Sequence, residues 1–126
     1  MELIRITAQS GRSLRQFYHP TRWSADQWAK LAAPMLELVT HLEEDVSHSP
    51  LWAFTSHEDL VFSAQDDYRQ GTVRVHPLGK MHGGPAKARF EVCRPIDAPW
   101  SHAVGYAEDV QQAWRLIRDA LPAPPA

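Results

Sequence analysis

Glycines, lysines and histidines that could hold a phosphate gather in the stretch VHPLGKMHGGPAK, residues 75–87. A phosphate-binding loop needs a glycine five places before its Gly-Lys pair, a Ser or Thr after that pair, and a helix to follow. No glycine stands five places before Gly79, and Met81 occupies the place of the Ser or Thr. The next apolar run is typical of a strand. The stretch is therefore interpreted as a long loop between two strands.

A metal site is a second possibility for the histidines. His76 and His82 are six residues apart and could be joined by a third ligand such as His57, His102 or Asp97. Zinc sites usually contain a close pair of ligands at a fixed spacing, and this sequence has no such pair. We expect no structural metal and no cofactor, while metal binding by His57, His76 and His82 stays open as an alternative.

Catalytic chemistry has two candidates. The tripeptide HED at 57–59 sets an imidazole beside two carboxylates, which are the groups used in acid–base catalysis. Three polar residues between apolar runs are equally what a tight hairpin turn requires, and we favour the turn. Cys93 could act as a nucleophile with His76 opposite, but a cysteine inside a strand is typically packing material. We predict no catalytic residues and hence no enzyme.

Composition limits the class of protein further. The chain has 126 residues, 44% of them hydrophobic and 22% charged, as expected of a single soluble globular domain. Its net charge of -2 argues against binding to nucleic acid. One cysteine excludes an internal disulfide, and neither a signal peptide nor a membrane-spanning segment is recognisable. We therefore expect a cytoplasmic protein.

The elements that must position these residues follow from periodicity. Alternation at 3–9 and 13–19 predicts an opening hairpin. Apolar residues at helical spacing predict a helix over 25–45, bent at Pro34 and started by a capping box of Ser24 and Gln27. A second helix is expected from about Glu108 to Leu121, where Pro122 ends it.

Four apolar runs between the helices, LWAFTS, LVFSA, TVRVHPL and ARFEVCR, predict an antiparallel meander, and SHAVGY could add a short strand. Alternation places two sets of residues on opposite faces: Val73, Val75, Phe90 and Val92 on one, and Arg74, His76, Arg89 and Glu91 on the other. The predicted fold is α+β, with one mainly antiparallel sheet in the order β-β-α-β-β-β-β-α and two amphipathic helices on one face. It forms a single domain over 1–121, followed by a disordered Pro/Ala tail at 122–126.

Contact with another protein remains as a function. Tryptophan and tyrosine bury a large area at small entropic cost and often anchor interfaces. Trp100 stands in the proline-bounded stretch DAPWSH, where a loop is expected. We predict that these residues bind a partner: Trp100, Tyr68, Asp66, Asp67, His82 and Lys80.

The layout resembles the small cytoplasmic immunity proteins of bacterial polymorphic toxin and contact-delivered effector systems. The elements that carry this resemblance are LVFSAQDDYRQGTVRVHPL in the meander and EDVQQAWRLI in the closing helix. It implies the role of binding a cognate toxin or effector and blocking it. We expect the protein to be non-enzymatic and either monomeric or homodimeric. The alternatives are a small enzyme or a ligand- or metal-binding domain that uses His57, His76, His82 and Cys93, or an accessory subunit of a larger complex.

Overall fold

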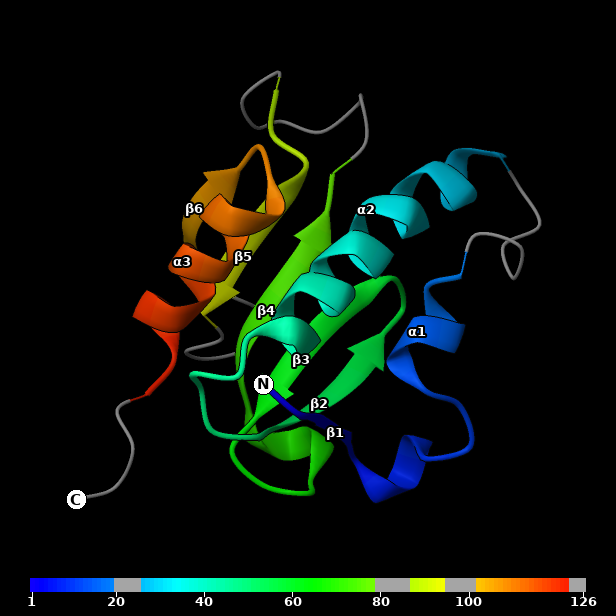
Figure 1. The fold of residues 1–126 in the computed structure, drawn as a ribbon, viewed down its shortest axis with the longest axis vertical. Helices are drawn as coiled ribbons and strands as arrows, with labels where there is room; N and C mark the ends of the chain where they lie inside the picture. Colours follow the sequence, from blue (N-terminus) through cyan, green and yellow to red (C-terminus); the bar gives the residue numbers. More distant parts are fainter. Residues whose placement is uncertain (20–25, 79–86, 95–101, 123–126) are drawn as a thin grey trace.

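The computed structural model describes residues 1–19, 26–78, 87–94 and 102–122, and these form one six-stranded sheet with helices on one side (Figure 1). The strands are β1 (Leu3–Arg5), β2 (Leu51–Ser56), β3 (Asp59–Ser63), β4 (Gly71–Pro77), β5 (Phe90–Arg94) and β6 (His102–Ala107). The α-helices within these residues are α1 (Leu14–Phe17), α2 (Asp26–Glu44) and α3 (Val110–Ala120), and two 3-10 turns are η1 (Thr7–Gln9) and η3 (Tyr68–Gln70).

The strands lie in the sheet in their sequence order, β1 to β6. All neighbours from β2 to β6 pair antiparallel, as expected for a meander joined by short connections, whereas β1 pairs parallel to β2. The predicted α+β class with one mainly antiparallel sheet is confirmed. No helix among the residues described has both the length and the apolar composition needed to span a bilayer.

The predicted N-terminal hairpin is wrong. Only Leu3–Arg5 is a strand, and the segment expected to be its partner, 13–19, contains the helix α1. Ser13 accepts a hydrogen bond from the Gln16 backbone N–H, while the Gln16 side chain accepts one from the Ser13 N–H. This capping box starts a helical turn, so the segment folds as a helix although its apolar residues alternate as in a strand.

All three α-helices pack on one face of the sheet (Figure 1). Here α2 runs as one helix through Pro34, as predicted, while Ser24 and the side chain of Gln27 lie outside the described part of the chain. The larger side chains of the main core include Leu14 and Tyr18 at α1, Met35, Leu38, Val39 and Leu42 of α2, Trp114 and Ile117 of α3, and Leu60, Phe62, Val73, Val75, Phe90 and Val92 of the sheet. Full burial of a large apolar side chain contributes about 1.5–3 kcal/mol, so this face carries most of the stability.

The Asp45 carboxylate, just after the end of α2, accepts hydrogen bonds from Trp114 of α3 and from the nearby Ser47. The Trp114 indole N–H donates to Oδ2 at 2.6 Å, and the backbone N–H and hydroxyl of Ser47 donate to Oδ1 at 2.9 and 2.5 Å. These bonds, those from Ser47 first, lower the pKa of Asp45 well below its ordinary value. The ionised carboxylate is therefore the form that the folded protein prefers.

Replacing Asp45 by Asn is expected to lower the melting temperature at neutral pH, because the charged acceptor is lost. A lowered folded-state pKa stabilises the fold above the unfolded-state pKa of about 4, and this stabilisation disappears as the pH falls through the folded-state pKa. The difference in melting temperature between the two proteins should therefore shrink below about pH 4. Thermal melts from pH 7 to pH 2 measure it, with Asp119→Asn on the exposed side of α3 as the control. A difference that stays constant or grows on acidification would contradict the assignment.

Candidate functional site

The two-residue turn between β2 and β3 carries Glu58, the first side chain of the candidate site. His57 and Glu58 form the turn, and His57 has a φ of 54°, a left-handed value suited to tight hairpin loops. The Tyr18 hydroxyl donates a hydrogen bond of 2.9 Å to the Glu58 carbonyl and so ties the turn to the helical layer. The predicted turn at HED is confirmed, and its last residue, Asp59, begins β3.

Strand register brings four polar side chains into line across the face of the sheet that is opposite the described helices, here called the open face. Leu60 pairs with Val75, so the next residues outward, Asp59 and His76, are neighbours. His76 pairs in turn with Glu91, and Glu91 with Tyr106. Asp59, His76, Glu91 and Tyr106 form what we call the polar row, with one residue on each of β3 to β6.

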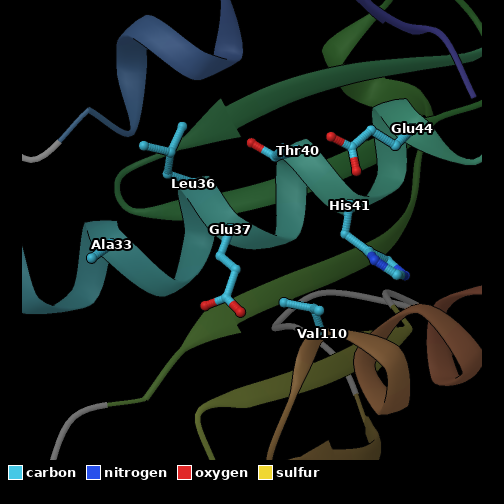
Figure 2. A pocket seen from close by; sticks show the side chains of 7 residues that line it. All are labelled: Ala33, Leu36, Glu37, Thr40, His41, Glu44 and Val110. Carbon is cyan, nitrogen blue, oxygen red and sulfur yellow. The ribbon is translucent and has the colours of Figure 1, made fainter.

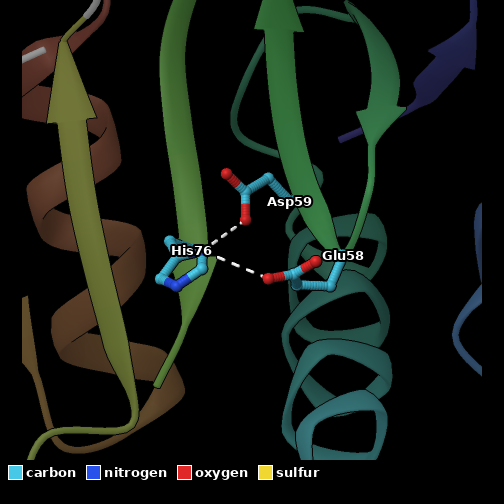
Figure 3. A group of neighbouring side chains, drawn as sticks. All are labelled: Glu58, Asp59 and His76. Atoms are coloured by element: carbon cyan, nitrogen blue, oxygen red, sulfur yellow. Dashed lines mark hydrogen bonds and ion pairs between the residues drawn. The ribbon is translucent and has the colours of Figure 1, made fainter. Parts of the chain in front are cut away.

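Asp59 is the buried end of the polar row, with 6% of its surface exposed. Its Oδ1 lies 2.5 Å from His76 Nδ1 (Figure 3), and its Oδ2 lies 3.2 Å from Nε of the Arg74 guanidinium. The second carboxylate, from Glu58, lies on the same side of the imidazole, with Oε1 at 3.8 Å from Nδ1. The hydrogen bond to Asp59, aided by the charges of Asp59, Glu58 and Glu91, raises the pKa of His76 against the opposing effect of burial.

The other half of the polar row centres on Glu91. The Cys93 thiol donates to Glu91 Oε1 over 3.1 Å, and a hydrogen bond to the Glu91 carboxylate is the main cause of a raised pKa of Tyr106. Cys93 is buried and pairs with Arg74 in the register, so the expectation that His76 stands opposite it is wrong. The thiol of Cys93 is thus held against a carboxylate of its own strand.

Apolar side chains lie near both ends of the polar row. Toward β2, the buried residues Phe54, Val61 and Ile6 form a small second core with Trp52 packed against it. At the edge of the sheet, on β6, Val104 and the last member of the polar row, Tyr106, have 42% and 40% of their surfaces exposed. The polar row therefore ends, at β6, in exposed apolar and aromatic surface.

Three of the six residues predicted to bind a partner are described by the structure, and these lie at the other end of β3 from Asp59. Tyr68, on η3, is 63% exposed. Asp66 accepts hydrogen bonds from the backbone N–H and the hydroxyl of Thr7, and Asp67 caps η3 through the Arg69 N–H, so both aspartates have structural partners. Lys80, His82 and Trp100 lie outside the described residues.

Two further predictions, one on the faces of the sheet and one on the ligands of a metal site, have mixed outcomes. Arg74, His76 and Glu91 lie on the open face as predicted, and Val73, Val75, Phe90 and Val92 lie in the core. Arg89 differs, because it precedes β5 and its guanidinium lies 3.4 Å from Glu37 of α2, on the helical side. Of the residues considered for a metal site, His76 clusters with Glu58 and Asp59 rather than with His57, while His82, Asp97 and the side chain of His102 are outside the described part.

A shallow hollow lies on the helical side of the molecule, between α2 and the start of α3 (Figure 2). Its lining consists of Ala33, Leu36, Glu37, Thr40, His41, Glu44 and Val110. The hollow is separated from the polar row by the sheet, so the two features do not combine into one site.

Comparison with known proteins gives no match to a family model, to a curated protein or to a solved structure.

Proposed function

We propose that this protein is a non-enzymatic binding domain that contacts a partner protein through the open face of its sheet. The observation that carries the proposal is the exposure of Tyr106, at the β6 end of the polar row, and of Val104 on the same strand. Aromatic and apolar side chains next to well-fixed polar groups are typical of the centre of protein interfaces.

The charge of this face defines the kind of partner. Glu58, Asp59 and Glu91 contribute three carboxylates, and Arg74 contributes one guanidinium. A partner that presents lysines or arginines to this face would be steered toward it and held in register by complementary charge. Arg74 and Asp59 form an ion pair that is largely buried, so the more exposed Glu58 and Tyr106 are the groups of this face that a partner would meet first.

The more specific role that we propose is that of a cytoplasmic immunity protein, which neutralises a cognate toxin or effector by occupying its surface. The support is the resemblance in layout together with the mildly acidic balance of the chain. Non-catalytic inhibition requires only a well-fitting surface, and the hydrogen bonds within the polar row order some of the groups that such a fit would use.

The proposal is tested by mixing the purified protein with the product of the adjacent gene and separating the mixture by size-exclusion chromatography. A complex of defined stoichiometry is expected. Failure to form one at micromolar concentrations, with the first protein folded, would contradict the immunity role. The molecular mass of the protein alone distinguishes this role from self-association through the open face.

Two tyrosines provide a matched pair of variants that locates the interface. Tyr106→Ala is expected to weaken the complex by about 30-fold or more, the effect of losing an interface anchor. Tyr68→Ala makes the same chemical change at the other exposed tyrosine and should alter affinity by less than about 3-fold. Titration calorimetry measures both. The reverse order of effects would move the interface to the 66–68 segment that the sequence predicts.

A further inference from the structure

We propose that Glu58, Asp59 and His76 form a binding site for a divalent transition metal, with Zn²⁺ as the best fit. Each side chain offers one ligand atom, and these atoms all lie within 4.8 Å of one another (Figure 3). The proposal rests on this geometry and is independent of the proposed function.

The positions of the three ligand atoms require little movement to hold zinc. Zinc binds nitrogen and oxygen at about 2.0–2.2 Å, so ligand atoms of a tetrahedral site are about 3.4 Å apart. The distance from His76 Nδ1 to Glu58 Oε1 is 3.8 Å, and that to Asp59 Oδ1 is 2.5 Å. Rotation of the half-exposed His76 side chain can close the first distance and open the second, because its ring is not enclosed by the core.

The surroundings of the cluster compensate a dication. Glu58, Asp59 and the neighbouring Glu91 contribute three negative charges, and the Arg74 guanidinium contributes one positive charge. Arg74 lies on Oδ2 of Asp59, which leaves Oδ1 for the metal and fixes the orientation of the carboxylate. An outer partner of this kind is a regular feature of metal sites.

The mixture of ligands selects the class of metal. An imidazole nitrogen with two carboxylate oxygens suits zinc and its transition-metal neighbours, whereas Ca²⁺ and Mg²⁺ prefer oxygen ligands alone. Three protein ligands also leave a fourth position for water or for a ligand from another molecule. We therefore expect Zn²⁺ and Co²⁺ to bind, and millimolar Mg²⁺ or Ca²⁺ not to displace them.

The experiment is a titration of the full chain with Zn²⁺ at pH 7.5 by calorimetry, followed by Co²⁺ absorption spectroscopy on the same protein. One equivalent of Zn²⁺ is expected to bind, and Co²⁺ is expected to give visible d–d bands that Zn²⁺ removes. Glu58→Gln should weaken Zn²⁺ binding by about 10-fold or more, and His76→Ala by about 100-fold. Glu58→Gln keeps the backbone carbonyl that Tyr18 uses, so this variant tests the site even where His76→Ala disturbs the fold.

Glu91→Gln is the matched control, because it removes the same charge from the same face without removing a ligand. It should change Zn²⁺ affinity by less than about 3-fold. If Glu58→Gln and Glu91→Gln lost the same amount of Zn²⁺ affinity, the binding would reflect only the general attraction of cations to this face, and the proposed site would be contradicted. Binding that survives both Glu58→Gln and His76→Ala would place the metal elsewhere, and absence of binding to the unaltered chain would refute the proposal directly.

Discussion

Replacing Asp59 by Ala is expected to lower the free energy of unfolding by about 2 to 4 kcal/mol, the cost of breaking a largely buried ion pair from one side. Asp59 is 6% exposed as a residue, and its carboxylate lies between Arg74 and His76. Its removal leaves the guanidinium, itself mostly covered, without the carboxylate that compensates its charge. Urea unfolding of both proteins measures the difference, and a drop in melting temperature of about 10 °C should accompany it.

A second substitution tests the physical reason for this loss. Arg74→Leu in the Asp59→Ala background removes the charge that Asp59 balanced and should recover about half of the lost free energy, because an apolar pair can replace an ion pair at little cost. Asp67→Ala serves as the control, since its partner Arg69 is on the surface and such pairs contribute about 0–1 kcal/mol. An Asp59→Ala variant as stable as Asp67→Ala would contradict the importance of the buried pair.

The meander can be predicted from the sequence because its signals are local. In β4 and in the first part of β5, apolar and polar residues alternate, and each strand buries the predicted face against the helices. For the same reason, alternation alone assigns Arg74, His76 and Glu91 to the face opposite the core. Helices α2 and α3 have uninterrupted apolar spacing, and their predicted bounds agree with the observed ones to within a few residues.

The contact between Asp59 and His76 cannot be predicted in the same way. It depends on the register of β4 against β3, and the number of residues between the two strands does not determine that register. Between β3 and β4 lie η3 and an irregularity at Phe62/Ser63 that shifts the pairing by one residue. A shift of one residue moves a side chain to the other face of the sheet, so sequence spacing alone does not define the partners. The tripeptide HED therefore indicates only a turn, and the imidazole that completes the cluster comes from another strand.

The prediction for the N-terminal segment is wrong for a related reason. The alternation in this segment agrees with a hairpin. However, β1 pairs with β2 in parallel, and the chain between these two strands contains both α1 and α2. Parallel neighbours need a long crossover, and nothing in the alternation of one short strand distinguishes this arrangement from a local hairpin. The capping box at Ser13 and Gln16 is the available signal against a strand at 13–19.

Replacing Trp114 by Ala is expected to have the largest effect on stability, a loss of about 3 to 5 kcal/mol, since it empties a large buried site. Trp114 is buried in the core on α3, contacts the His48 ring edge-to-face at 5.4 Å, and donates its indole N–H to Asp45. Trp114→Phe keeps most of the packing and loses that hydrogen bond, so about 1 to 2 kcal/mol should be lost. Denaturant unfolding of the three proteins measures this order, and equal losses in both variants would contradict it.

The Trp114 variants also test whether the two faces of the sheet act independently. Trp114 packs on the helical face, whereas Glu58, His76 and Tyr106 act on the open face, with the sheet between them. Under conditions in which Trp114→Phe is fully folded, its affinity for Zn²⁺ and for a partner should therefore equal that of the unaltered protein. Loss of either affinity in the folded variant would mean that the helical layer sets the geometry of the open face, through contacts such as that between Tyr18 and the Glu58 carbonyl.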